Sequence, residues 1–156
     1  MRRTLRFVHL IGLVLFLGSI LTFIVVSSVP ATWDVASLVV ARRVISTGTN
    51  VLTLPGLGLL IGSGVGLTWG QLRVRDHRWL QVMVLAAGLI ALNGFVFVLP
   101  AVRSASALIE EAQSLGTVTE AYTRAYVLES SAGSVNVILG LVAMVAGVVG
   151  ARRAVP

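Results

Sequence analysis

Four long apolar runs limit what this chain can fold into more than any other feature of its sequence. They cover about residues 7–29, 51–69, 79–99 and 132–150. Each run is close to the roughly 20 residues that an α-helix needs to cross the hydrocarbon core of a bilayer. Charged residues make up only 12% of the chain, whereas soluble domains carry about 25%. We therefore predict an all-α membrane protein, a bundle of four transmembrane helices that forms one domain over residues 1–156.

The first run also has features of a secretory signal peptide, because arginines precede it and Val29-Pro30-Ala31 could serve as a cleavage site. Its apolar stretch is longer than the roughly 7–15 residues that are usual in such peptides. We therefore predict that this run is retained as the first transmembrane helix.

A polar segment separates the first run from the second. It places Val35, Leu38 and Val39 beside Arg42 and Arg43, a pattern that predicts an amphipathic helix. We expect this helix to lead into the second span near Pro55. The sequence leaves open whether residues 31–47 lie on the membrane or in it.

A second polar segment, of about residues 101–131, lies between the third and fourth runs and holds four glutamates. Because proline removes a backbone donor from a helix, Pro100 is predicted to end the third span. The alanine and glutamate content after it predicts one or two short helices, broken at Gly116. We expect this segment to form a short extracytoplasmic excursion.

The arginines predict the orientation of the bundle, and they account for all twelve basic residues. With the N-terminus inside, eight of them fall on the cytoplasmic side, namely Arg2, Arg3, Arg6, Arg73, Arg75, Arg78, Arg152 and Arg153. Four fall on the other side, namely Arg42, Arg43, Arg103 and Arg124. The positive-inside rule then predicts that both termini lie in the cytoplasm, and we expect a multi-pass protein of the cell (inner) membrane. This distribution explains the net charge of +6, so no nucleic-acid partner is expected.

Small residues predict how the helices pack, because lipid gives apolar helices no hydrophobic reason to associate. The second span has glycines at four-residue spacing: Gly58, Gly62, Gly66 and Gly70. We expect this bare stripe to form a helix–helix contact, including one between two copies in a homodimer. The alternative is a flat macrocycle or a lipid tail lying against it. The fourth span repeats the pattern more loosely, with Gly140, Ala143, Gly147 and Gly150.

Two amides, Asn93 and Asn136, fall within the predicted third and fourth spans, both in the outer half. A mutual hydrogen bond is the simpler expectation for polar side chains at this depth. The alternative is that either amide binds the polar group of a ligand.

The sequence argues against several reaction types. It contains no cysteine and no visible Ser/His/Asp arrangement or phosphate-binding loop, so a hydrolase or a phosphoryl-transfer enzyme is not expected. An ion pump would normally place an acid in the middle of a span, and the predicted spans hold none there.

His9 is the residue that points most directly to a cofactor. A haem ligand needs a neutral imidazole and a small neighbour that admits the ring, and Gly12 and Phe16 follow His9 along one helix face. In this reading Gly62 and Gly66 lie near the porphyrin and Arg43 pairs with a propionate. The alternative is an interfacial histidine that hydrogen-bonds headgroups or a carbonyl.

His77 is predicted at the same membrane depth as His9. The two histidines would then give bis-histidine haem ligation, or bind a metal with a third ligand from a partner chain. The alternative for His77 is a solvated loop, because arginines and an aspartate surround it in the run RVRDHRW.

The order of these features resembles that of uncharacterised predicted integral membrane proteins related to the CopD-like and HemJ-like group. The resemblance rests on RFVHLIGLVLFLGS, ARRVISTGTNVLTLPGLGLLIGSG and RDHRWL, and covers roughly residues 5–100. It implies a small helical bundle. HemJ-like proteins are implicated in protoporphyrinogen oxidation and carry haem b on a histidine of an early helix, a position that His9 matches. CopD-like proteins are linked to copper handling.

Three functions are therefore weighed. The first is a membrane haem b protein, acting in electron transfer or as a haem-dependent oxidoreductase, with His9 as axial ligand. The second is a non-catalytic membrane interaction protein that dimerises through the glycines of the second span. The third is a carrier for a small apolar or lipidic molecule.

Overall fold

The computed structural model describes residues 2–28, 34–68 and 77–153. Within these ranges only Asp34, His77 and residues 116–119 lie outside helices. The helices form four long rods, and all four are long and apolar enough to cross a membrane. The prediction of an all-α chain with four helices of membrane-spanning length and hydropathy is therefore confirmed for the described residues. The alternative cleavage site at residues 29–31, Gly70 and the two arginines at 73 and 75 lie outside the described residues.

The first and last rods are single helices, α1 (Arg2–Ser28) and α6 (Glu120–Arg153). The second rod joins α2 (Val35–Gly48), the π-helix η1 (Thr49–Thr53) and α3 (Leu54–Thr68). The third joins α4 (Arg78–Asn93), the π-helix η3 (Gly94–Val98) and α5 (Leu99–Leu115). The amphipathic helix expected before the second span is therefore α2, and it continues into that span without a break.

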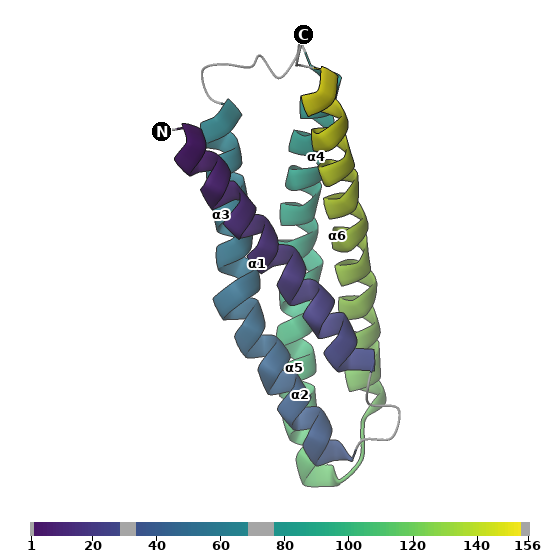
Figure 1. The fold of residues 1–156 in the computed structure, drawn as a ribbon. Coiled ribbons are helices and arrows are strands. Elements are labelled where there is room, and N and C mark those ends of the chain that lie inside the picture. Colours follow the sequence, from purple (N-terminus) through teal and green to yellow (C-terminus); the bar gives the residue numbers. More distant parts are fainter. Residues whose placement is uncertain (1, 29–33, 69–76, 154–156) are drawn as a thin grey trace.

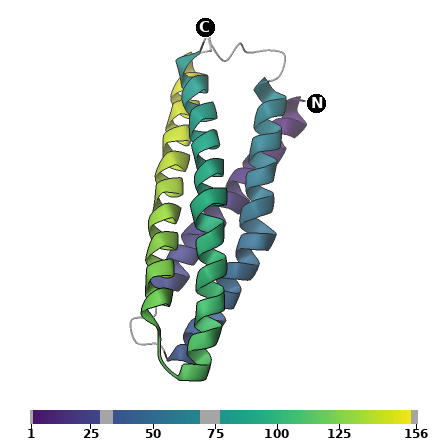
Figure 2. The ribbon, with the colours of Figure 1, turned by 180° about the vertical axis from the view of Figure 1, so that it is seen from behind.

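The rods pack in pairs, as Figure 1 shows: α1 lies diagonally across the bundle against α3, and α4 runs beside α6. From behind, α3 and α4 stand apart (Figure 2), in keeping with the absence of close packing between the described residues of these two helices. The first residue of α1 and the last of α6 lie at the same end of the bundle. At the opposite end α2 packs against α5 and α5 against α6, so this end is closed.

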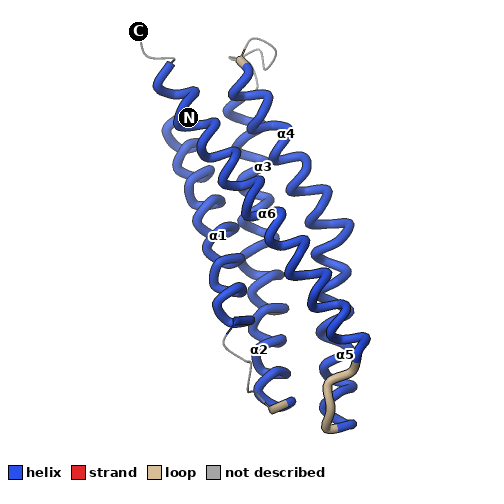
Figure 3. Tube along the Cα trace, turned by 90° about the vertical axis from the view of Figure 1, so that its right-hand side faces the viewer, coloured by secondary structure: helices blue, strands red, loops and turns tan. Residues whose placement is uncertain are grey.

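The closed end carries its own hydrophobic core. Its members are Val39 of α2, Ala105, Ile109 and Ala112 of α5, and Tyr122 of α6. Figure 3 shows α2 and α5 reaching this end side by side, with the connection to α6 beyond them. Small alanines on α5 allow the helices to approach closely. A second core cluster, Phe16, Leu57 and Ile90, joins the middles of three rods.

The expected stop at Pro100 is wrong, because the third rod continues through it as α5. Proline cannot donate a hydrogen bond four residues back, and a π-turn relieves the conflict by bonding over five residues. The N–H of Leu99 donates to the carbonyl of Gly94 in η3. The second rod uses the same device, since the N–H of Leu54 donates to the carbonyl of Thr49. Each π-helix ends two residues before a proline, Pro55 or Pro100.

The segment of residues 101–131 also differs from its prediction. A helix break does occur at Gly116, which has φ 68° and so adopts the left-handed conformation that glycine tolerates. The flanking helices are not short separate pieces, however, because α5 extends the third rod and α6 runs unbroken into the fourth.

At the start of α2, the Asp34 side chain accepts a hydrogen bond from the N–H of Ser37 at 2.9 Å. Hydrogen bonds from the side chain and backbone of Ser37 lower the pKa of Asp34.

Candidate functional site

The crossing of α1 and α3 occupies the helix face on which the sequence placed haem. A Cβ atom on Gly12 would lie 2.8 Å from the backbone nitrogen of Leu60 and 2.9 Å from the carbonyl oxygen of Gly56. One on Gly56 would lie 2.8 Å from the nitrogen of Phe16. The two glycines therefore let one helix backbone rest directly on the other, a small-residue contact of the kind that joins membrane helices.

His9 takes part in the same contact. Its Nδ1 atom lies 3.0 Å from the hydroxyl of Ser63 on α3, and its ring is half-buried. Phe16, one of the residues expected to flank a porphyrin, is buried in the core against Leu57. Gly12, the small residue that a haem site would need beside His9, makes room for the backbone of α3 and not for a porphyrin ring. These residues therefore do not fit a haem between α1 and α3.

The other residues expected at the cofactor lie apart from this crossing. Gly62 is exposed, and a Cβ added to it would meet no atom within 4 Å. Gly66 is also exposed and approaches only Leu5 of α1. His77 precedes α4, and its ring centroid lies 6.2 Å from that of Trp79. Among the described residues no group of three or more His, Asp or Glu side chains could hold a metal ion.

Among the described glycines of the predicted stripe only Gly66 approaches α1, and the closest contact between the two helices uses another face of α3. Gly58, like Gly62, has open space where its side chain would be, and α3 meets α1 through Gly56 instead. The glycines of the fourth span do form the expected contacts, with Gly140 against Leu17, Gly147 against Met83 and Gly150 against Trp79.

A cavity of about 280 Å³ lies between the rods. All four long rods line it, mainly with apolar side chains such as Phe16, Ile20, Phe23, Leu57, Phe95 and Val98. Ligand sites are typically concave, mostly apolar and supplied with a few placed polar groups. This cavity has that composition.

Both π-helices border the cavity. Thr49 and Thr53 of η1 line one side, and Gly94, Phe95 and Val98 of η3 line another. Single π-turns inside α-helices are frequent at functional sites, because the wider turn redirects the side chains beside it. The Leu-Pro pairs that follow both π-helices were the sequence signal for this feature, although Pro100 was interpreted as a helix end.

Polar groups on the cavity wall are tied by hydrogen bonds. The amide of Asn93 donates to the Oδ1 atom of Asn136 and to the carbonyl of Ala132, both at 2.8 Å. The predicted bond between the two amides is therefore confirmed. On the opposite wall, the hydroxyl oxygens of Ser19 and Thr53 lie 2.8 Å apart. These bonds hold the lining in place without a ligand.

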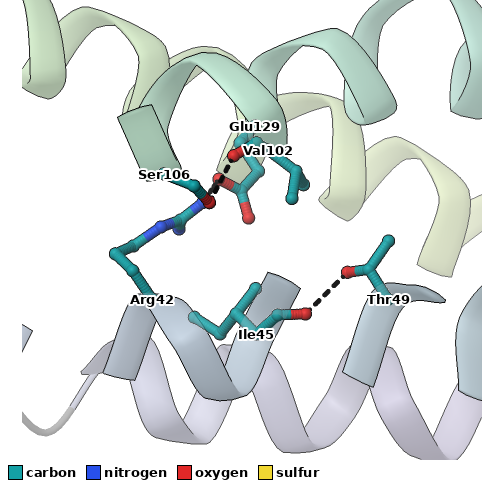
Figure 4. A network of polar contacts seen from close by, with 6 residues as sticks. All are labelled: Arg42, Ile45, Thr49, Val102, Ser106 and Glu129. Carbon is teal, nitrogen blue, oxygen red and sulfur yellow. Dashed lines mark hydrogen bonds and ion pairs between the residues drawn. The ribbon is translucent and has the colours of Figure 1, made fainter. Parts of the chain in front are cut away.

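An ion pair lies beside the cavity, whose lining includes Glu129. Arg42 of α2 and Glu129 of α6 lie with Nη2 and Oε2 2.5 Å apart, and their side chains are only 3% and 14% exposed. Figure 4 shows the arginine reaching from α2 toward Glu129, past Ser106 of α5. Its neighbour Arg43, the arginine expected at the cofactor, is 69% exposed and lies 3.9 Å from Glu110. The arginine that is buried in a close ion pair is thus Arg42, and not Arg43, which was expected at the cofactor.

In comparisons with protein-family models, curated proteins and solved structures, the chain matches none of them. The resemblance to the CopD-like and HemJ-like group therefore stays a prediction.

Proposed function

We propose that this protein binds an apolar, chain-like molecule from the lipid bilayer in the cavity between its rods. The observation that carries the proposal is a cavity of about 280 Å³ whose lining is largely apolar and beside which lies a buried ion pair. Burying an ion pair is costly, because both charges lose their water. Of the three functions weighed from the sequence, the carrier for a lipidic molecule fits this cavity best.

The depth of the cavity supports a ligand drawn from the membrane. Counting about 20 residues from Thr68, Arg78 and Gly150, at the end of the bundle that holds both termini, reaches Gly48, Val98 and Ser130. Both π-helices then lie just inside the hydrocarbon core. The ion pair of Arg42 and Glu129 lies at the level of the headgroups. An acyl or isoprenoid chain would occupy the cavity at its natural depth.

Binding can be tested on the purified full-length protein in detergent micelles with a fluorescent polyene fatty acid. Its emission rises in an apolar site, and we expect the rise to saturate with protein. Gly133 lines the cavity, and a Cβ atom added to it would meet no other atom within 4 Å. Gly133→Leu should therefore fill the cavity without a clash and abolish saturable binding.

Gly88→Leu is the matched control, because Gly88 is exposed on α4, has equal space and does not line the cavity. It should bind the probe as the unchanged protein does. Absence of saturable binding to the unchanged protein would overturn the proposal, as would full binding by Gly133→Leu.

The proposed orientation keeps both termini in the cytoplasm of a cell whose inner membrane holds the protein. Its support is the excess of arginine at the end of the bundle that carries the termini, as the positive-inside rule requires. The cavity would then open in the outer half of the membrane.

A homodimer is the second candidate, and the outward direction of Gly58 and Gly62 favours it. Exposed small residues at four-residue spacing allow two helices to approach closely. Gly62→Leu should then shift the protein from dimer to monomer in lipid-exchange or cross-linking measurements, whereas Gly88→Leu should not. An equal monomer fraction in all three proteins would remove this candidate.

A further inference from the structure

We propose that Arg42 binds the anionic head of the ligand, a carboxylate or phosphate attached to the chain that fills the apolar cavity. This inference rests on the proposed function and narrows it from an apolar chain to an anionic amphiphile. The proposed site for the head group is a polar space on the side of the ion pair that lies away from the apolar cavity.

The first observation is that Arg42 has unused donors. Its Nη2 atom meets Glu129, but Nε and Nη1 are buried and have no acceptor among the described residues. A buried donor left unpaired destabilises the protein, so such groups normally have a partner. A guanidinium is well suited to a carboxylate or phosphate oxygen, because its donors are planar and charged.

The second observation is a separate cavity of about 200 Å³ that Arg42 itself lines. It lies between α2 and α5, and polar side chains make up most of its wall: Arg42, Arg43, Ser46, Thr47, Ser106 and Glu110. Hydroxyls and arginines are the side chains that most often contact carboxylate and phosphate oxygens. The nearby Glu110 faces Arg43 at 3.9 Å, so its charge is opposed within the same wall.

The two cavities follow one another along the same helices. On α5, Val102 lines the apolar cavity and Ser106, one turn later, lines the polar one. In the second rod, Thr49 lines the apolar cavity and Ser46 lines the polar one. The pair of Arg42 and Glu129 stands at the boundary, since Glu129 lines the apolar cavity and Arg42 the polar one. Figure 4 shows Thr49, Val102 and Ser106 around the pair.

This order matches the chemistry of an amphiphile. The chain would lie in hydrocarbon, and its charged end would reach the arginine at headgroup depth. A fatty alcohol of equal length would fill the apolar cavity equally well but offers no charged oxygen to Nε and Nη1. Discrimination between acid and alcohol is therefore the property to measure.

The test is displacement of the fluorescent fatty acid by a long-chain fatty acid and by the alcohol of the same chain length. For the unchanged protein we expect the acid to compete at a concentration about tenfold or more below the alcohol, because hydrogen bonds to charged groups contribute about 1.5–3 kcal/mol. Arg42→Gln alone would leave Glu129 buried without its partner and could unfold the bundle. The informative protein is the double variant Arg42→Gln/Glu129→Gln, which keeps shape and polarity without charge.

In the double variant the alcohol should compete as before, while the advantage of the acid disappears. Because the charged probe also loses this contact, the titration is repeated with a fluorescent fatty alcohol. Arg43→Gln is the control, since Arg43 is exposed and adjacent, and it should keep the preference for the acid. Equal preference for the acid in the double variant and the unchanged protein would overturn the role of Arg42.

The two proposals fail in different ways. If neither fluorescent chain binds saturably, the chain site itself is absent. If both chains bind but acid and alcohol compete equally in the unchanged protein, only the head-group site is overturned. The last competitor to test is inorganic phosphate. If phosphate alone displaces the fatty acid, Arg42 binds a free anion, and the proposal that it binds the head of an amphiphile is overturned.

Discussion

At the scale of single residues, the closest approach between helices depends on two glycines that the sequence did not pair. Gly12 was interpreted as space for a ring and Gly56 was not singled out, yet each would place a Cβ atom 2.8 Å from the backbone of the other's helix. Backbone cannot move aside as the end of a side chain can. The contact therefore tolerates glycine alone.

Gly12→Ala should destabilise the bundle by about 1–3 kcal/mol, the usual effect of forcing atoms into a packed interface. The measurement is thermal unfolding of the purified protein in detergent. Gly18→Ala on the same helix is the control, because a Cβ there meets nothing within 4 Å. Alanine also favours helix over glycine by up to about 1 kcal/mol, so Gly18→Ala should be neutral or stabilising. Equal unfolding temperatures for both variants would show that α1 and α3 do not cross at these glycines.

His9 allows a direct test between its two interpretations. If it is held by Ser63, His9→Ala should lower stability by about 1 kcal/mol through loss of one hydrogen bond. The visible spectrum of the protein should not change. A Soret band in the unchanged protein that disappears in His9→Ala would instead support haem, and would mean that α1 and α3 separate to admit it.

The sequence could predict the partner of a polar residue only where few other partners were available at the same depth. Asn93 and Asn136 had few other partners at their depth, so their bond was foreseeable. Arg42 and Arg43 are neighbours with the same chemistry, and successive residues of an α-helix point about 100° apart. The packing of α5 and α6 around α2 decides which of them is buried, and the ion-pair partner Glu129 lies 87 residues away.

At the scale of the elements, the two π-helices are the features that shape the site. The apolar runs predicted the spans because length and hydropathy are sufficient for that purpose. Pro100 misled the prediction because proline usually ends helices, whereas a π-turn before it lets the rod continue. The repeated order of π-helix, leucine and proline in two rods indicates that the widened turns are part of the cavity's construction.

Pro55→Ala and Pro100→Ala should each raise the thermal stability of the protein and weaken its binding of the fatty acid. Alanine restores the N–H that can bond four residues back, so the preceding turn can return to α geometry. Because proline in a helix interior costs about 3 kcal/mol, thermal stability should rise in both variants. Binding of the fluorescent fatty acid should weaken, since the side chains of η1 or η3 would turn away from the cavity. Higher stability with unchanged binding would show that the π-turns serve the prolines alone.

At the scale of the whole molecule, the rods are longer than a membrane is thick. The second and third rods have 34 and 38 residues within their apolar spans and extensions, or about 51 and 57 Å at 1.5 Å per residue. The hydrocarbon core is about 30 Å thick. The excess lies at the end closed by α2, α5 and α6, where the glutamates gather. In the proposed placement, the end where α3 and α4 stand apart would lie in the membrane, and the end closed by α2, α5 and α6 would lie outside it.

This asymmetry makes the orientation measurable. The chain has no cysteine, so single cysteines can be introduced without background. Arg3 and Gln113 are both exposed and lie near opposite ends of the bundle. With both termini in the cytoplasm, Gln113→Cys should react with a membrane-impermeant maleimide on intact cells, and Arg3→Cys only after the cells are opened. The reverse pattern would turn the bundle over and put the cavity in the cytoplasmic leaflet, where the arginine excess would lie on the wrong side for the positive-inside rule. Labelling of both positions on intact cells would mean that the rods do not span the membrane. The first outcome alone places Arg42 among the headgroups of the outer leaflet, where an amphiphile would have to present its charged end.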